Sequence, residues 1–198
     1  MVNLKKISCI IAAIIILISL SGCSNNERLT DMTVIQAVGI DCERGVVSVC
    51  IQYLDIDKGT GTNEGVKGNI TAIAKGKGES IEKALSSLEK TLTDRLFFSQ
   101  NKIIILGNNT EEELGNEIKK YISDNQRCRP DTLIVKSVSS AENVVKNPQR
   151  GSRVPSESLC QQLKRENAAF TANDYLNSYK ENSLPSVEAK DDYTVVHK

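Results

Sequence analysis

Apolar residues alternate with polar ones in some segments of the chain and recur at helical spacing in others. These two patterns predict β-strands and α-helices respectively. Residues 33–41 are rich in β-branched side chains, and residues 46–56 alternate between apolar and polar positions. A short turn at residues 42–45, which ends in a glycine, separates the two runs. Alternation with a period of two on both sides of a glycine-containing turn predicts an antiparallel β-hairpin.

After this hairpin, apolar strands alternate with amphipathic helices. Strands are predicted at residues 69–75, 102–106 and 132–138, where aliphatic side chains cluster. Ser80 can cap a helix. The apolar stripe of that helix has helical spacing and consists of Ile81, Ala84, Leu85, Leu88 and Leu92. The pattern therefore favours helices that connect successive strands.

Two later helices are each introduced by a threonine or serine that stands three residues before a glutamate. Thr110 precedes Glu113 in the first, and Ser139 precedes Glu142 in the second. In such a capping box the two side chains satisfy free N–H groups of the first helical turn. The pairs predict that helices begin at these positions.

Helix-linked strands behind an antiparallel hairpin define the expected fold class as α+β. We predict a mixed sheet with an antiparallel N-terminal hairpin and helices packed on it, followed by short helices. Residues 23–147 are assigned to this N-terminal α+β domain. Residues 148–198, with helical patterns at 155–163 and 171–179, are expected to form a helical extension and a linker. The stretch from Asp191 onward has the pattern of a beginning strand.

The first 22 residues differ in chemistry from the rest of the chain. Lys5 and Lys6 precede an uncharged run of 14 residues, Ile7–Leu20. A helix that spans a bilayer needs about 20 apolar residues, whereas the core of a signal peptide needs roughly 7 to 15. The run ends in Leu20-Ser21-Gly22-Cys23, a sequence that resembles a bacterial lipobox.

The lipobox resemblance implies that residues 1–22 are a lipoprotein signal peptide and that Cys23 carries a lipid. The thiol of Cys23 would receive a diacylglyceryl group with palmitate-type chains. Cleavage within the motif formed by Leu20, Ser21 and Gly22 would then leave Cys23 as the first mature residue. Two or more acyl chains hold a protein stably at a membrane. The alternatives are an uncleaved short anchor and an ordinary signal peptide that ends near a cysteine.

Composition narrows the classes of function. The chain has 25 basic and 25 acidic residues, and loss of Lys5 and Lys6 with the signal peptide changes the formal charge from zero to −2. Proteins that bind nucleic acid usually carry an excess of basic residues on one surface, and the balanced charge of this chain argues against such a surface. His197 is the only histidine, which argues against a histidine-dependent nucleophile and a histidine-based zinc site. We expect no catalytic residue, no metal, no cofactor and no nucleic-acid partner.

Four cysteines follow the lipobox, and none belongs to a CxxC pair. They are Cys42, Cys50, Cys128 and Cys160. Their irregular spacing indicates neither a zinc site nor a disulfide framework. We expect four free thiols, with a Cys42–Cys50 bridge as the alternative.

Two glycine motifs could be taken for phosphate-binding loops, and one pair of aspartates for catalytic carboxylates. Local structure accounts for all three features more simply. Gly59-Thr60-Gly61 and Gly76-Lys77-Gly78 do not match the spacing of phosphate-binding loops. For Gly59-Thr60-Gly61 the simpler explanation is a flexible loop, and for Gly76-Lys77-Gly78 it is a turn before the first helix. Asp55 and Asp57 could act as paired carboxylates, but they stand where a strand enters a glycine-rich loop and are expected to be solvated.

Two clusters of charged residues are also explained by local structure better than by a binding site. Residues 111–113 are three glutamates at the beginning of a predicted helix, where the helix dipole favours negative charge. Arg127, Arg129 and Arg150 could form a patch for anionic lipid or a ligand. Solvated or salt-bridged surface arginines are the favoured interpretation.

The order of motifs behind the lipobox resembles that of a known family. The segments that carry the likeness are Glu27–Asp31, Val34–Asp41, Lys77–Ala84, Leu96–Gly107 and Asp124–Arg129. Together they resemble the Ger(x)C family, the C-subunit lipoproteins of spore germinant receptors in endospore-forming Firmicutes. The likeness covers essentially the whole mature chain. One departure is Gln100 or Asn101, where many relatives carry a histidine to which no catalytic role is attached.

The family resemblance implies a non-enzymatic subunit that works with two integral-membrane partners, the A and B subunits of the receptor. It implies a lipid-anchored scaffold on the outer face of the spore inner membrane, with ligand-binding residues unassigned. Family members are longer and fold as successive domains. The resemblance therefore implies a truncated form that holds the first domain and the approach to a missing second one. A small-molecule-binding lipoprotein of the cell envelope remains the alternative.

Overall fold

A computed structural model describes residues 32–55, 69–92, 94–147, 149, 151–178, 184–191 and 193–197. The predictions made for residues 1–23, including the lipobox and Cys23, lie outside these ranges. The same holds for Asp57, Gly59-Thr60-Gly61 and Arg150. The structural account below concerns the described residues, which belong to one unit of the chain, Met32–Lys198.

The predicted hairpin is confirmed, and a third strand extends it. Strands β1 (Met32–Glu43) and β2 (Val46–Leu54) pair antiparallel, and β3 (Thr71–Gly78) pairs antiparallel with β2. The two-residue turn between β1 and β2 consists of Arg44 and Gly45, which both have positive φ, 53° and 75°. Two positive φ angles in succession match the type I′ turn, whose twist suits the right-handed twist of a hairpin.

The remaining strands complete a mixed sheet. They are β4 (Arg95–Phe97), β5 (Ile103–Leu106), β6 (Leu133–Ser137), β7 (Ser186–Lys190) and β8 (Tyr193–His197). The sheet has the order β3-β2-β1-β5-β6-β7-β8, with β4 paired beside the beginning of β1. The central strands β1, β5, β6 and β7 are parallel, whereas both edges are antiparallel. The expected α+β class with a mixed sheet is confirmed.

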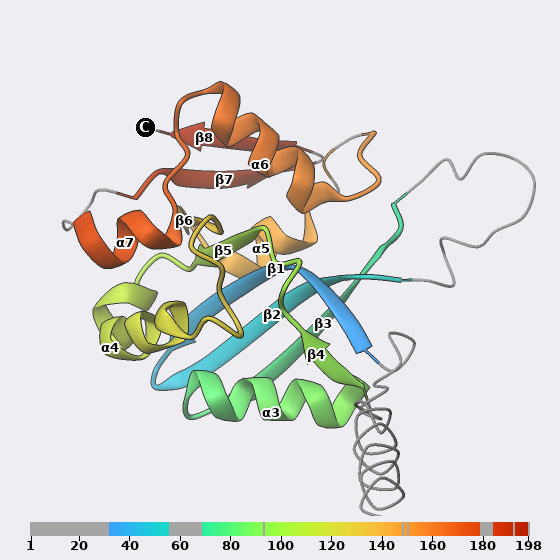
Figure 1. Ribbon diagram of the computed structural model, residues 1–198, viewed down its shortest axis with the longest axis vertical. Helices are drawn as coiled ribbons and strands as arrows, with labels where there is room; N and C mark the ends of the chain where they lie inside the picture. The colour runs from blue at the N-terminus through green and yellow to red at the C-terminus, as the bar shows by residue number, and fades with distance from the viewer. Residues whose placement is uncertain are drawn as a thin grey trace, which may run out of the picture. The chain divides into compact units, whose positions relative to one another are not determined.

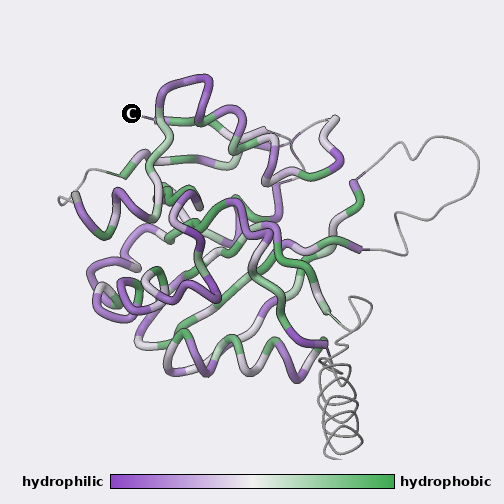
Figure 2. The backbone as a smooth tube through the Cα atoms, in the orientation of Figure 1, coloured by the Kyte–Doolittle hydropathy of each residue, from purple (hydrophilic) through white to green (hydrophobic). Residues whose placement is uncertain are grey.

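Helices pack on both faces of this sheet (Figure 1). Helices α3 (Ile81–Leu92), α4 (Thr110–Ser123) and α7 (Ala172–Ser178) contribute to the buried cluster on one face. Helices α5 (Ala141–Lys146) and α6 (Pro155–Arg165) contribute to the cluster on the other face. Apolar residues accordingly concentrate along the strands between the helices (Figure 2).

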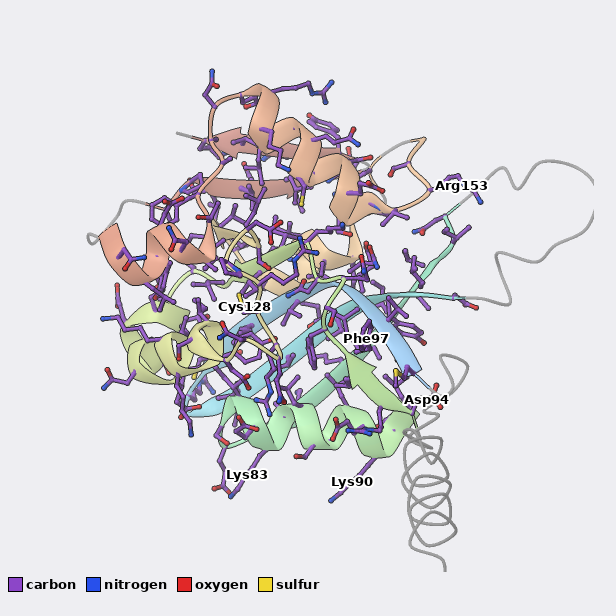
Figure 3. All side chains as sticks on the ribbon, in the orientation of Figure 1. Lys83, Lys90, Asp94, Phe97, Cys128 and Arg153 are labelled. Atoms are coloured by element: carbon purple, nitrogen blue, oxygen red, sulfur yellow. The ribbon has the colours of Figure 1, made fainter. Side chains whose placement is uncertain are left out.

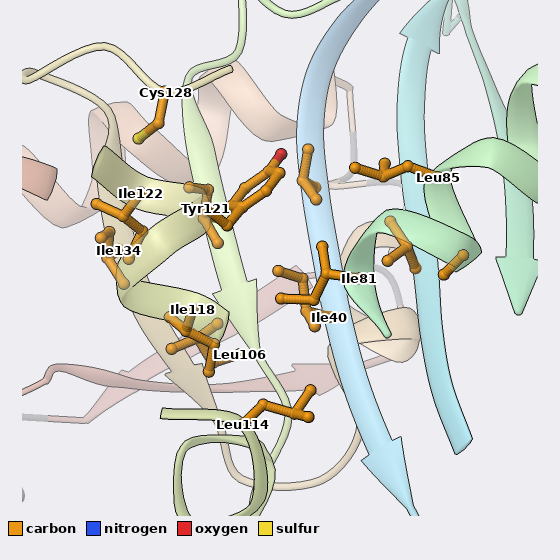
Figure 4. Close-up of a cluster of buried hydrophobic side chains, with 14 of the residues drawn as sticks. Ile40, Ile81, Leu85, Leu106, Leu114, Ile118, Tyr121, Ile122, Cys128 and Ile134 are labelled. Carbon is orange, nitrogen blue, oxygen red and sulfur yellow. The ribbon is translucent and has the colours of Figure 1, made fainter. Parts of the chain in front are cut away.

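The larger cluster lies under α3 and α4 (Figure 4). Its central side chains come from both helices and from β1, β5 and β6, and include Ile40, Ile81, Leu85, Leu106, Ile118, Ile122 and Ile134. Tyr121 meets Phe98 edge to face, with ring centroids 6.5 Å apart and an interplanar angle of 82°, a favoured aromatic geometry. The stripe predicted from Ile81 to Leu92 is therefore the face that α3 buries.

The helix starts differ in part from the sequence-based predictions. Ser80 does cap α3, since its Oγ accepts from the N–H of Lys83 at 3.2 Å. The capping box at Thr110 is wrong, because Thr110 is the first residue of α4 and its hydroxyl donates to the carbonyl of Ile40 instead. At α5 the capping residue is Ser140, one position after the predicted Ser139. At α4, a buried hydrogen bond from Thr110 to strand β1 replaces the local cap.

The region after residue 147 also differs from the expected helical extension and linker. Helices α6 and α7 form where predicted. Ser186–Lys190, however, is strand β7, which pairs in parallel with β6 and buries Val187 completely. Strand β8 then closes an antiparallel hairpin. The boundary expected at residue 148 therefore needs correction, because both strands belong to the sheet of the preceding domain.

Candidate functional site

A polar hollow of about 570 Å³ lies where the carboxyl ends of β1, β5 and β6 meet. We call it the Asp41 hollow. Side chains from three strands and from the loops after β5 and β6 line it, among them Asp41, Ser48, Lys75, Lys77, Asn108 and Ser139. The carboxyl ends of parallel strands are where open α/β sheets usually place ligands. The hollow is therefore the candidate site that the fold positions best.

Asp41 organises the inner wall of this hollow. Its Oδ1 accepts from the backbone N–H of Ala141 at 2.7 Å, and its Oδ2 accepts from that of Glu142 at 3.0 Å. Burial raises the pKa of the Asp41 carboxyl, and the two N–H groups offset part of that increase. A Cβ on Gly107 would lie 2.1 Å from Asp41 Oδ1, so only glycine leaves room for this carboxylate.

A lysine–glutamate–lysine network borders the same hollow. Glu142 accepts from the ammonium groups of both Lys75 on β3 and Lys146 on α5. Hydrogen bonds from Lys146 and then Lys75 lower the pKa of Glu142 below its usual value. The network ties the edge strand β3 to α5, and it compensates the negative charge beside Asp41.

Cysteine reactivity at the hollow is low. Cys42 lines it, and its thiol donates to Glu113 Oε2 at 3.1 Å. Burial raises the pKa of Cys42 to about 11, and the hydrogen bond to Glu113 adds to the effect. A thiol with this pKa is protonated near neutral pH and is a poor nucleophile. Cys42 therefore contributes a protonated thiol to the hollow rather than a thiolate.

The other cysteines are buried, and the structure keeps them apart. The four described cysteines are free thiols. Cys42 lies opposite Val47 and Cys50 lies opposite Gly39 in the β1–β2 hairpin, so register separates the pair considered for a bridge. Burial raises the pKa of Cys50 and of Cys160 to about 12, and that of Cys128 to about 11. These thiols act as small apolar side chains.

Among the described residues, the remaining predicted candidates do not converge on a site. Arg127 forms a two-point contact with Glu82, including Nη2–Oε2 at 2.9 Å, and Arg129 pairs with Asp131. The favoured salt-bridged interpretation is confirmed for these two arginines. Asp55 lies just after β2, and His197 ends β8 with Nε2 at 3.6 Å from Glu188. Residues 111–113 form the first turn of α4, as predicted.

Gly76-Lys77-Gly78 has a structural role that sequence reasoning missed. A Cβ on Gly76 would lie 2.2 Å from the carbonyl oxygen of Ala84, and one on Gly78 would lie 2.6 Å from Ala84 N. The two glycines let the end of β3 contact the backbone of α3. Their spacing of two, which places both on one face of a strand, was the available signal.

The described residues contain no group of histidine, cysteine, aspartate and glutamate side chains that could hold a metal ion. Across the same ranges, no helix has the combined length and apolar character needed to cross a bilayer.

On α3, Lys83 and Lys90 project away from the sheet (Figure 3), as expected for the polar face of an amphipathic helix.

The described part is thus an α+β domain with a polar hollow at its strand ends. A family model described as "Spore germination protein N-terminal domain" matches residues 25–187, and the chain belongs to this family. Spore germination protein KC of Bacillus subtilis (strain 168) is 25% identical over 161 residues. That match covers 76% of this chain but only 39% of the relative. No solved structure matches the chain.

Proposed function

We propose that this chain is a lipid-anchored, non-enzymatic subunit of a nutrient germinant receptor that acts in spore germination. The observation that carries the proposal is a juxtaposition in the sequence. The lipobox-like Leu20-Ser21-Gly22-Cys23 ends one residue short of Asn25, where the match to the germination family begins. An anchoring signal and a germination domain that are separated only by Ser24 support an anchored member of this family.

Lipidation of Cys23 would place the domain at a membrane surface. Eight residues separate Cys23 from Met32, the first residue of β1. A stretch of that length reaches about 30 Å when fully extended. Two acyl chains on Cys23 would therefore hold the domain within that distance of the outer leaflet. This position is compatible with the integral-membrane A and B subunits as partners, and with the spore inner membrane as the location.

A binding role rather than an enzymatic one is supported by the chemistry of the described side chains. Burial keeps the four described thiols protonated. His197 stands on the edge strand β8, whereas the Asp41 hollow is lined by residues of β1, β2 and β3 and of the loops after β5 and β6. The name of the relative from Bacillus subtilis refers to germination. In the proposed role the domain contacts protein partners and carries out no bond-making step.

The test is Cys23→Ala in a spore-forming strain that carries no other copy of the gene. We expect loss of labelled palmitate from the protein and a weaker germination response to nutrients. Cys9→Ala is the matched control, because it removes a cysteine from the apolar run and leaves Leu20-Ser21-Gly22-Cys23 intact. Normal nutrient-triggered germination by the Cys23→Ala strain would contradict a lipid-dependent role.

The Asp41 hollow favours one second candidate, a small-molecule-binding lipoprotein. Its volume of about 570 Å³ falls within the range of ligand pockets, although such pockets are usually lined by apolar side chains. Calorimetry of the purified chain against amino acids and sugars distinguishes the two functions. Saturable binding that Asp41→Asn removes would favour the second candidate, and the absence of heat would leave the receptor subunit as the better account.

A further inference from the structure

The two edges of the sheet differ in how well the rest of the chain covers them. The sheet ends in β3 on one side and in β8 on the other. On β8, Thr194 is only 2% exposed, and its carbonyl accepts from Gln162 Nε2 of α6 at 3.1 Å. On β3, by contrast, Lys75 and Lys77 are both exposed. Within the described ranges, the edge of β3 is therefore the open one.

The direction of the backbone groups on β2 follows from a hydrogen bond of β1. The carbonyl of Ile40 on β1 accepts from the N–H of Gly107, just after β5, at 2.8 Å. The backbone groups of Ile40 thus point to β5 and away from β2. The residue opposite Ile40 on β2 is Val49. In an antiparallel pair that is not hydrogen-bonded, both residues point away from each other, so Val49 points to β3.

The same alternation identifies the backbone groups that face the open edge. Val49 pairs with Gly76 on β3, and the two form a hydrogen-bonded pair. Because the direction alternates along a strand, the N–H and C=O groups of Ile73, Lys75 and Lys77 point away from β2. Unpaired groups of this kind are a template on which another strand can form.

The lysines decide which kind of strand suits this edge. Lys75 and Lys77 stand two residues apart, so both side chains lie on the same face of β3. Pairing β3 with the β3 of a second copy would bring like charges together, which is unfavourable. Lys75 already contacts Glu142, whereas Lys77 forms no salt bridge within the described ranges. The charge therefore disfavours a second copy and favours an acidic strand.

The other face of the edge offers space for side chains and further positive charge. A hollow of about 550 Å³ lies beside the end of β3. Lys77 and Gly78 line it from β3, and Lys83, Ser87 and Lys90 line it from α3. Lys83 pairs with Glu79, while Lys90 projects from the helix (Figure 3). Side chains of an added strand that point toward α3 would enter this hollow.

We propose that the open edge of β3 binds an extended acidic segment of a protein partner. The segment adds a strand to the sheet, and its backbone bonds the N–H and C=O groups of Ile73, Lys75 and Lys77. Its carboxylates pair with Lys77 and Lys90. In such strand addition the main-chain bonds supply affinity and the side-chain contacts supply specificity. The inference does not depend on the germination role.

The experiment uses a fluorescein-labelled peptide of alternating sequence, Thr-Glu-Val-Glu-Val-Glu-Thr. The full chain is purified in non-ionic detergent, and binding is followed by fluorescence polarisation. We expect saturable binding that weakens as salt is added, because salt screens exposed charges. The same peptide with lysine in place of glutamate should not bind. Absence of saturable binding by the acidic peptide would overturn the proposal.

Methylated forms of the peptide separate strand addition from simple attraction of charge. Methylation of every backbone nitrogen removes all N–H donors and keeps the three carboxylates, so we expect binding to be lost. Methylation of alternate nitrogens leaves one edge of the peptide intact, and that peptide should still bind. Binding by the fully methylated peptide at full affinity would contradict strand addition. This comparison uses the natural chain and needs no variant to fold.

One charge reversal locates the site on β3. Lys77→Glu should weaken binding of the acidic peptide by about tenfold, because it places like charges side by side. Lys119→Glu, at an exposed position of α4, is the matched control and should leave affinity unchanged. Equal affinity of the two variants would overturn the proposal. Phosphatidylglycerol vesicles that bind the natural chain more tightly than the peptide does, and that Lys77→Glu releases, would assign the surface to anionic lipid instead.

Discussion

The carboxylate of Asp41 and the backbone N–H of Ala141 are joined by a hydrogen bond of 2.7 Å, although 100 residues separate them in the sequence. The second carboxylate oxygen bonds the next N–H, that of Glu142. The end of β1 is thereby attached to the first turn of α5. One side chain thus connects two elements whose relative position shapes the hollow at the strand ends.

Asp41→Ala should lower the free energy of unfolding by about 2 kcal/mol. The substitution leaves two backbone N–H groups of α5 without their acceptor, and hydrogen bonds to a charged group contribute about 1.5–3 kcal/mol. Urea unfolding at neutral pH measures the effect. Asp131→Ala is the control, since that carboxylate is exposed and paired with Arg129. Its loss should cost less than about 1 kcal/mol, and equal losses for the two variants would show that the Asp41 contact is unimportant.

Stability of the natural chain should depend on pH through Asp41. Burial raises the pKa of this carboxyl above 3.8 in the folded protein, so the folded state binds the proton more tightly than the unfolded state does. Its contribution is therefore most favourable below pH 3.8 and declines as pH rises through the folded pKa. Asp41→Asn lacks this titration. The difference in stability between the natural chain and the variant should shift in favour of the variant as pH rises from 3.8 through the raised pKa of Asp41, and a constant difference would refute the assignment.

Gly76→Ala and Gly115→Ala should change stability in opposite directions. A Cβ at Gly76 would lie 2.2 Å from a backbone oxygen of α3, whereas one at Gly115 meets nothing within 4 Å. We expect the first substitution to cost about 3 kcal/mol through overpacking. The second should stabilise α4 by about 1 kcal/mol, because alanine is the better helix former. Thermal unfolding of both variants checks the sign, and a Gly76→Ala variant as stable as the natural chain would contradict the close contact.

Val187→Ala tests whether β7 belongs to the core of this domain. Val187 is completely buried in the cluster beneath α5 and α6, and loss of its methyl groups should cost about 2 kcal/mol. Val195 on β8 is only partly buried, so Val195→Ala should cost less than about 1 kcal/mol. Both values come from urea unfolding followed by circular dichroism. A negligible effect at Val187 would favour the separate extension that the sequence suggested.

Much of the fold could be predicted because its signals are local. The β1–β2 hairpin shows alternation around a glycine-containing turn, and the buried stripe of α3 repeats at helical spacing. Ser80 and the bond to its own first turn lie within three residues. Such patterns record which face of an element is buried. They do not record which element covers it. For this reason the sequence pattern predicts a helical extension and linker for residues 148–198, the range that contains β7 and β8.

The sequence by itself determined the α+β class, the order of most strands and helices, and the lipobox resemblance, because each depends on neighbouring residues. Only the tertiary structure decided the roles of Asp41, Gly76 and Asn101. Asp41 meets its partners 100 and 101 residues away, and Gly76 faces a helix backbone. Asn101 is polar in sequence, yet it is buried without a partner among the described residues. These roles arise from contacts that exist only after the sheet has assembled.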